Sequence, residues 1–220
     1  MTHADGFFTI GSTHAVCQDY VRTGTTSAGR VYAIVSDGCS SSKDTDIGAR
    51  LLVRAAESLL HNGSMPFSMI AVAATARAYA TALGLPSTCL DATLMVAFSD
   101  PSSPFAYAHW VGDGSVIARR KDGGDPLVYQ VVYPDGMPFY PNYYLSKDAQ
   151  DHFSVAKPCR ATYSCNDPEH PRIGSWDPYE RYHYWLSFDK DVYDIVALLS
   201  DGAQSFRDKD NVPISEDQVF

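Results

Sequence analysis

Hydrophobic runs that stop at an aspartate are the most regular feature of this chain. The first run, Val31–Val35, is β-branched and aromatic, as expected of a buried strand, and Asp37 follows it after a single serine. Two later runs end in the same way, at Asp113 and at Asp201, and a glycine follows each of these three aspartates. One such ending usually marks a tight turn. Three of them favour a cluster of carboxylates that binds hard cations such as Mg²⁺ or Mn²⁺.

Helical periodicity follows the first of these strands. Apolar residues recur on one face of Asp46–His61, with Asp44 or Thr45 as the N-cap, and this spacing predicts a helix. A second helix is predicted from Pro66, in its first turn, through Met69–Leu83. Two consecutive helices with no strand between them predict an antiparallel pair that covers one face of a sheet.

The segment from Asp91 to Tyr133 changes to the pattern of strands. Four predicted strands follow one another closely: Thr93–Phe98, Phe105–Val111, Ser115–Arg119 and Leu127–Tyr133. The short turns between them predict an antiparallel meander. Together with the two helices, these strands predict an α+β fold in which helices cover a sheet.

The remaining segments are less regular. Phe7–Ile10 predicts a first strand, and the Thr-, Gly- and Ser-rich stretch Arg22–Gly29 predicts a loop that places this strand beside the first buried one. The stretch from Tyr133 to Phe188 holds eight of the 14 tyrosines, and a strand is predicted there only at Tyr182–Phe188. These aromatic residues either form a recognition surface or pack this long irregular segment against the rest of the domain, and packing is the commoner outcome.

Composition places the chain among ordinary globular proteins. Its 220 residues suffice for one well-buried domain, and 45% hydrophobic with 20% charged residues is typical of one. A formal net charge of −9 and the lack of any Lys/Arg run argue against a nucleic-acid surface. The sequence has no signal peptide and no apolar run near about 18 residues, and its five cysteines form no C-x-x-C pair. We therefore expect a cytoplasmic domain with reduced thiols, no membrane partner and no structural zinc site.

Common catalytic motifs are missing from the sequence. It contains no G-x-S-x-G nucleophile elbow, no phosphate-binding G-x-x-x-x-G-K-[ST] or G-x-G-x-x-G, and no H-E-x-x-H. The seven histidines are scattered, as surface or packing residues would be. The chemistry that remains is the set of carboxylates Asp19, Asp37, Asp113 and Asp201.

The order of these motifs resembles that of the PP2C-type (PPM) metal-dependent protein serine/threonine phosphatases, in a divergent bacterial-type form. Five elements match in sequence order: Cys17-Gln18-Asp19-Tyr20 is similar to N-(Q/E)-D-A, Val31–Gly38 to V-x-D-G, Asp91-Ala92-Thr93-Leu94 to G-(T/S)-T, Val111–Ser115 to V-G-D-S-R, and Leu198–Gly202 to L-x-S-D-G. The resemblance covers nearly the whole chain. It implies a four-layer α/β/β/α sandwich of two antiparallel sheets flanked by helices, which is an α+β fold.

The resemblance also implies a metal site and its ligands. Asp37 would bridge two Mg²⁺ or Mn²⁺ ions, the carbonyl of Gly38 would bind one of them, and Asp201 would ligate one. Asp113 would help to form a third, more weakly held metal site.

Catalysis in such a site would come from the metals and from the residues around them. Gln18 and Asp19 would hold metal-bound waters, and Asp19, Asp37 and Asp201 are the implied catalytic residues. A hydroxide that bridges the two ions would attack phosphorus in line, so that no protein nucleophile is needed.

The chain departs from the family pattern in two places. Where the family has an arginine that grips the substrate phosphate, this chain has His14, which is the implied phosphate-binding residue unless Arg22 or Arg50 substitutes for it. The family's last metal aspartate lies well beyond the S-D-G element, and Asp208 or Asp210 would have to replace it here. We therefore expect residues 1–220 to be a single domain that lacks its C-terminal strand and last metal ligand.

Two functions from different classes remain open. In the first, the chain hydrolyses phosphoserine or phosphothreonine on a phosphorylated protein with Mg²⁺ or Mn²⁺. In the second, it is a catalytically weak relative that binds a phosphoprotein or another partner through the aromatic stretch Tyr133–Trp185. A phosphatase assay with Mn²⁺, with and without chelator, separates them.

Overall fold

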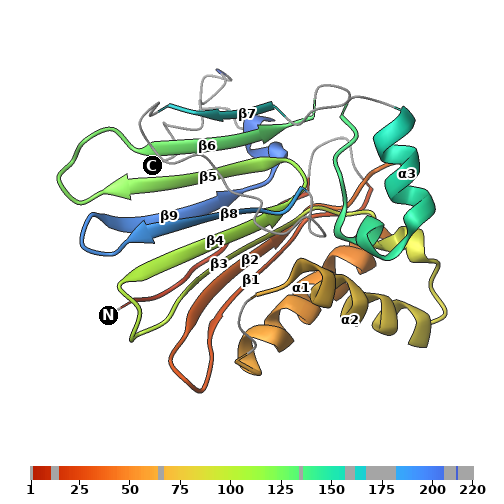
Figure 1. The fold of residues 1–220 in the computed structure, drawn as a ribbon, viewed down its shortest axis with the longest axis horizontal. Helices are drawn as coiled ribbons and strands as arrows, with labels where there is room; N and C mark the ends of the chain where they lie inside the picture. The colour runs from red at the N-terminus through yellow and green to blue at the C-terminus, as the bar shows by residue number, and fades with distance from the viewer. Residues whose placement is uncertain are drawn as a thin grey trace.

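Two antiparallel sheets packed face to face form the body of the protein. The computed structural model describes residues 2–10, 15–63, 67–133, 136–156, 162–166, 182–205 and 212. The five-stranded sheet has the strand order β1-β2-β3-β4-β8 and the four-stranded sheet the order β7-β6-β5-β9 (Figure 1). Their strands are β1 (Tyr20–Thr25), β2 (Val31–Ser36), β3 (Leu94–Ser99), β4 (Phe105–Val111), β5 (Gly114–Arg120), β6 (Leu127–Val132), β7 (Thr162–Cys165), β8 (Tyr184–Asp189) and β9 (Tyr193–Leu199).

β2 is buried on both faces, which confirms the prediction from its unbroken apolar run. Ile34 belongs to the face covered by helices, and Tyr32 on the same face reaches Glu57 of the first helix. The opposite face of this sheet packs on the four-stranded sheet, where Phe188 of β8 meets Tyr129 of β6 edge-on at 6.2 Å between ring centroids. A strand with both faces buried has no position for alternating polar residues.

The first strand is not where the sequence pattern predicts it. Residues 7–10 form no strand, and the predicted loop Arg22–Gly29 instead contains most of β1, which pairs with β2 in antiparallel register from Tyr20↔Ser36 to Thr25↔Val31. β1 is an edge strand, so a polar, glycine-containing sequence is tolerated in it. The hairpin turn that follows is closed by Gly29, whose φ of +81° suits glycine.

The predicted four-strand meander is wrong in one respect: it is divided between the two sheets. β3 pairs with β4 and β5 pairs with β6, but β4 does not pair with β5. The chain crosses from one sheet to the other at Gly112-Asp113-Gly114, where both glycines have positive φ, 105° and 132°. Glycine reaches this backbone conformation at little steric cost, so the connection can leave the first sheet abruptly.

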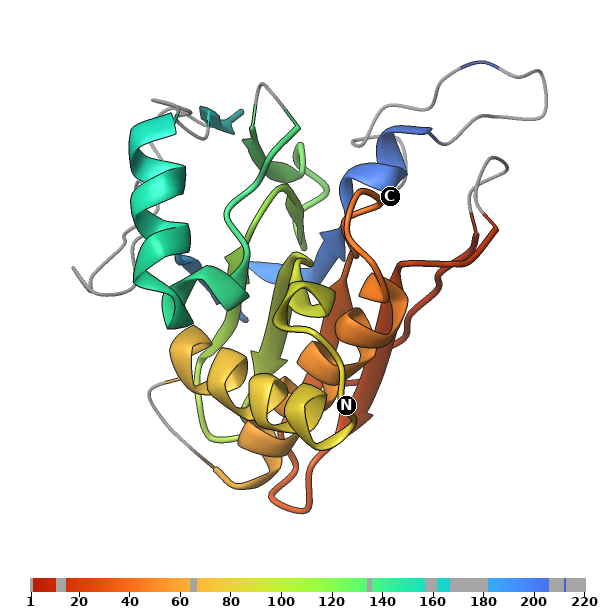
Figure 2. The same ribbon diagram turned by 90° about the vertical axis from the view of Figure 1, so that its right-hand side faces the viewer.

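Both predicted helices are confirmed, and they lie together over the five-stranded sheet. α1 (Thr45–His61) follows Asp44 as N-cap, and α2 (Met69–Ala82) begins after Ser68, whose hydroxyl accepts a hydrogen bond from the amide of Ala71. Pro66 lies outside the described residues. Figure 2 shows the two helices side by side in front of the strands. α1 turns Leu52, Val53, Ala56 and Leu60 into the core.

The other helical elements are short. α3 (Lys147–Ala156) lies near the ends of β6 and β7 (Figure 1). The described ranges also contain three short 3-10 helices: η1 (Ser87–Leu90), η2 (Pro141–Leu145) and η3 (Asp201–Ser205). The molecule is therefore an α+β sandwich of two antiparallel sheets with flanking helices, as predicted. None of the helices in the described ranges is long and apolar enough to cross a membrane.

The aromatic residues after β6 pack against one another. Phe139 lies at the centre of this cluster, and its ring is stacked on Tyr182 at 4.6 Å between centroids. The other aromatic neighbours of Phe139 are Tyr143, Tyr144 and Phe153. For the described part of this stretch, packing rather than a recognition surface is thus the outcome.

Candidate metal centre

Asp37 directly follows β2 and is held by Thr93, the residue before the neighbouring strand β3. Its backbone N–H donates to Oγ1 of Thr93 at 3.2 Å, and its carbonyl accepts from the N–H of Thr93 at 2.8 Å. Thr93 itself lies just before β3 in the Asp-Ala-Thr-Leu motif, so this motif fixes the backbone of Asp37. A carboxylate on such a support has a defined direction.

Asp19 lies opposite Asp37 at the same end of the sheet. The register Tyr20↔Ser36 of β1 and β2 places these two aspartates in the next pair, and the pairing continues to Gly38, whose N–H donates to the carbonyl of Gln18 at 3.2 Å. Directly opposed residues in an antiparallel pair lie about 4.5–5.5 Å apart. The two carboxylates are therefore neighbours.

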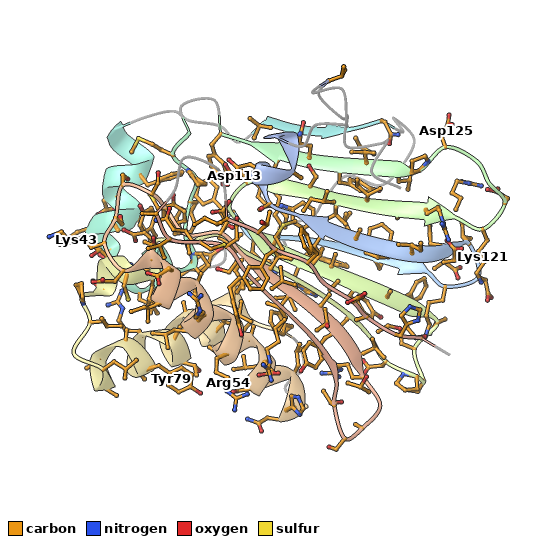
Figure 3. The ribbon with its side chains drawn as sticks, turned by 180° about the vertical axis from the view of Figure 1, so that it is seen from behind. Lys43, Arg54, Tyr79, Asp113, Lys121 and Asp125 are labelled. Carbon is orange, nitrogen blue, oxygen red and sulfur yellow. The ribbon has the colours of Figure 1, made fainter. Side chains whose placement is uncertain are left out.

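Asp113 and Asp201 come to this place from the other sheet. Asp113 lies in the crossing between β4 and β5, and Asp201 begins η3, separated by one residue from the end of β9. β5 and β9 are paired as far as Ser115↔Leu199, so the two aspartates leave the same end of that sheet. Figure 3 shows Asp113 at this end of the strands, whereas Lys121 and Asp125 lie at the opposite end.

The electrostatics of Asp37 agree with a convergence of the four carboxylates. Burial raises the pKa of Asp37 well above its ordinary range, and the negative charge of Asp19, a hydrogen bond with Asp201, and the charges of Asp201 and Asp113 raise it further. Burial, together with the charge of Asp201, likewise raises the pKa of Asp113 to about 6. These electrostatic interactions join aspartates that lie far apart in the sequence, so they arise from the tertiary fold and not from a local turn. Such a concentration of negative charge favours a bound cation.

Gly38 adds a backbone oxygen to this cluster. In the described part of the chain, no hydrogen-bond donor is directed at its carbonyl, although its N–H is paired with Gln18. A Cβ at this position would lie 2.9 Å from both the carbonyl oxygen and the Cβ of Thr45, so only glycine lets the start of α1 come so close. The Gly38 carbonyl is thus available as a ligand.

Gln18 has a clear structural role at this site. Its Nε2 donates to Oγ1 of Thr45 at 2.8 Å and to the carbonyl of Cys39 at 3.3 Å. The side chain therefore ties the segment before β1 to the loop that follows Asp37. Its expected part in holding a metal-bound water is a separate matter and stays a prediction.

The expected phosphate-binding residue His14 lies outside the described residues, as do Asp208 and Asp210. Of the two substitutes, Arg22 is paired with Glu57, with 2.5 Å between its Nε and Oε1 of the carboxylate. Arg50 places its guanidinium 5.2 Å from the ring centroid of Tyr20, the residue after Asp19. Arg22 also interacts with Tyr20, so contact with this residue does not distinguish the two arginines.

Two further residues, which the sequence patterns did not reveal, border the site. The hydroxyl of Tyr140 hydrogen-bonds to the thiol of Cys39, and burial followed by this contact raises the pKa of Tyr140, so the hydroxyl keeps its proton near neutral pH. Burial alone would raise the pKa of Cys39, but hydrogen bonds from Ser41 and Tyr140 lower it overall. Tyr140 precedes η2 in the least regular stretch, so no local signal marks it.

The donors fit a divalent cation of the hard, oxygen-preferring kind. Within the described ranges, no three His, Cys, Asp or Glu side chains form a group that could enclose a metal ion. Mg²⁺, however, is commonly held by one or two carboxylates and keeps several waters, and Mn²⁺ accepts the same oxygen donors. Asp37, Asp201 and the Gly38 carbonyl thus suit a water-rich site and not a closed protein cage.

Comparison with known proteins agrees with this fold. The family model described as protein phosphatase 2C matches residues 11–219. No match was found among curated proteins. A bacterial serine phosphatase that carries an arginine-to-lysine substitution matches with a TM-score of 0.54 and 10% identity, over 93% of this chain and 80% of that one. The serine/threonine phosphatase of S. agalactiae matches with a TM-score of 0.50 and 14% identity, over 92% and 81% of the two chains.

A third solved structure, a stage II sporulation E family protein from Thermanaerovibrio acidaminovorans, is 23% identical with a TM-score of 0.39. The match covers 46% of this chain and 49% of that one, so the chain spans about half the length of this relative. At 10% and 14% identity, the two phosphatase structures show a common fold only, whereas the family model covers nearly the whole sequence. The chain therefore belongs to the protein phosphatase 2C family.

Proposed function

We propose that the protein is a divalent-metal-dependent phosphatase that removes phosphate from serine and threonine residues of other proteins. The observation that carries this proposal is the convergence of Asp19, Asp37, Asp113 and Asp201, which come from both sheets, at one end of the sandwich. Family membership supports the same reaction. The acidic net charge of −9 agrees with a protein substrate rather than a nucleic acid.

The chain's own residues have distinct parts in this proposal. Asp37 and Asp201, with the Gly38 carbonyl, would hold two Mg²⁺ or Mn²⁺ ions. When bound, such ions lower the pKa of a coordinated water and neutralise phosphate charge. Asp19, opposite Asp37, would accept a hydrogen bond from water at the site. Asp201 is exposed, so a phosphate on a protein surface can approach from that side.

The alternative of a partner-binding module that uses the aromatic stretch has less support. Most of the described aromatic side chains there contact one another, and Tyr133, Phe139 and Tyr140 are buried. A binding surface would need these rings to be exposed.

Hydrolysis of p-nitrophenyl phosphate with Mn²⁺, with and without chelator, tests the proposal. We expect activity that the chelator abolishes and that Asp37→Asn and Asp201→Asn lose by orders of magnitude. Asp194→Asn is the matched control, because Asp194 lies at the other end of β9, in an exposed ion pair with Arg119. Phosphoserine and phosphothreonine peptides should be cleaved in preference to a phosphotyrosine peptide. Activity that survives chelation, or that persists in metal-loaded Asp37→Asn protein, would contradict the assignment.

A further inference from the structure

The loop that joins β2 to α1 controls where the Gly38 carbonyl lies. Gly38 forms an isolated bridge with Ala92, and the next residue, Cys39, is held from two sides. The N–H of Cys39 donates to the carbonyl of Asp91 at 2.9 Å, and its own carbonyl accepts from Oγ1 of Thr45 at 3.0 Å. The position of the Gly38 carbonyl therefore depends on what fixes Asp91.

Asp91 also holds this loop through its side chain. The residue is only 8% exposed, yet both oxygens of its carboxylate are used. Oδ2 accepts from the hydroxyl of Ser42 at 3.0 Å, and Oδ1 accepts from Nδ2 of Asn142 at 3.2 Å. A buried carboxylate is costly unless it is hydrogen-bonded, so these two bonds determine the geometry on both sides of it.

Asn142 connects this carboxylate to the helical layer. Its Nδ2 also donates to the carbonyl of Ser87 at 3.0 Å, and its Oδ1 accepts from Nη2 of Arg77 in α2. Asn142 is 6% exposed, so its hydrogen bonds are made inside the protein. The chain of contacts Arg77–Asn142–Asp91–Ser42 thus runs from α2 through η2 to the loop after Asp37.

We propose that Asp91 is a positioning residue for the metal centre: by holding Ser42 and Cys39, it fixes the Gly38 carbonyl in the direction of the metals. The inference rests on the proposed function. It also accounts for a buried charged residue at the place where the resembled motif has a small one. A side chain with a packing role alone would not need two oriented acceptors, one of them directed at this loop.

Two variants test the proposal from opposite ends of one hydrogen bond. Ser42→Ala removes only the loop hydroxyl, and Asp91→Asn keeps the shape but exchanges an acceptor oxygen for an amide donor. Glu57→Gln is the matched control, because Glu57 is another buried, hydrogen-bonded carboxylate but belongs to α1 and contacts Arg22, Tyr32 and Arg54 instead of this loop. The readouts are the Kd for Mn²⁺ by calorimetry, the kcat for p-nitrophenyl phosphate, and amide hydrogen exchange over residues 38–42.

We expect Mn²⁺ to bind about 10–100-fold more weakly to both variants, as is common when a residue that orients a ligand is lost. Their kcat should recover as the Mn²⁺ concentration rises, and their amides at 38–42 should exchange faster, whereas Glu57→Gln changes none of these. Wild-type affinity and exchange in both variants would overturn the proposal, and so would an equal loss in Glu57→Gln. If the wild-type protein bound no Mn²⁺, the proposed function would be wrong. Hydrogen exchange tests the positioning role separately: amides at 38–42 that exchange at the wild-type rate in both variants would show that Asp91 does not fix the loop.

Discussion

Asp37 lies among three other carboxylates, and its substitution separates the effect of charge from the effect of metal. In the metal-free protein, burial and the charges of Asp19, Asp113 and Asp201 oppose the ionisation of Asp37, and Asp37→Asn removes the group on which this repulsion acts. We expect the Tm of the metal-free variant to exceed that of wild type by about 2–4 °C for each kcal/mol of repulsion relieved. Thermal unfolding in the presence of chelator measures this difference. A lower Tm in the variant would mean that hydrogen bonds or positive charges inside the protein outweigh the repulsion between Asp37 and the other carboxylates.

Glu57 shows the opposite behaviour of a buried acid. Burial would raise the pKa of Glu57, but hydrogen bonds from Tyr32, Arg22 and Arg54 outweigh burial and lower it to about 2. An unfolded glutamate titrates near about 4.3, so the ionised group contributes up to about 3 kcal/mol, fully present above that pH and lost as the pH falls toward the folded pKa.

The free energy of unfolding should therefore fall more steeply for wild type than for Glu57→Gln on going from about pH 5 to about pH 3. Urea denaturation of both proteins over this range measures the two slopes. Parallel curves would show that Glu57 has a nearly normal pKa in the folded protein.

At the scale of secondary structure, one glycine determines how closely α1 approaches η1. Gly48 is in the first turns of α1, and a Cβ built there would overlap the carbonyl oxygen of Cys89 in η1. Alanine normally stabilises a helix relative to glycine by about 1 kcal/mol. At this position the sign should reverse, because the neighbour is backbone and cannot rotate away.

We expect Gly48→Ala to lower the free energy of unfolding by more than about 1 kcal/mol, in the range of overpacked sites. The control is Ala74→Gly on the exposed side of α2. This change should lower the free energy of unfolding by about 1 kcal/mol, because alanine is the better helix residue at an exposed position. Chemical denaturation of both variants gives the comparison. A stabilised Gly48→Ala protein would show that α1 can move away from η1, and with it from Asp91.

The crossing between β4 and β5 shows why an element-level pattern is not enough. Each strand was predictable by itself, and β4 has the predicted bounds Phe105–Val111. The pairing partner was not predictable, because a three-residue connection with two glycines suits a hairpin and a change of sheet equally well. Packing decides for the change of sheet: Ala108 and Trp110 of β4 are fully buried, as are Val116 and Ala118 of β5.

For the whole molecule, metal binding should appear as stability. A ligand present at about 100 times its Kd stabilises the folded state by about 2.7 kcal/mol. For a chain of 220 residues this corresponds to a rise in Tm of about 5–10 °C. We expect such a rise with Mn²⁺ and its reversal by chelator, measured by differential scanning fluorimetry. Asp37→Asn should show almost none of it, and an undiminished rise in that variant would place the ion elsewhere.

The sequence alone determined the features that depend on short-range pattern. The hydrophobic strands that precede Asp37 and Asp201, and the two helices between β2 and β3, follow from hydrophobic period and turn residues within a few positions. The order of five short motifs was enough to indicate the family and the α+β sandwich. These features could be predicted because the burial of a strand or a helix face requires a local pattern of side chains.

Only the tertiary structure decided which segments meet. β1 has the composition of a loop and becomes a strand because β2 offers it an unpaired edge. In the sequence, nothing distinguishes Asp91 from other acidic residues. Its proposed role depends on a hydrogen bond from Asn142, 51 residues later in the chain. The same holds for the raised pKa of Asp37, which arises from carboxylates on both sheets. Burial and charge repulsion act through space, so their consequences appear only once the chain has folded.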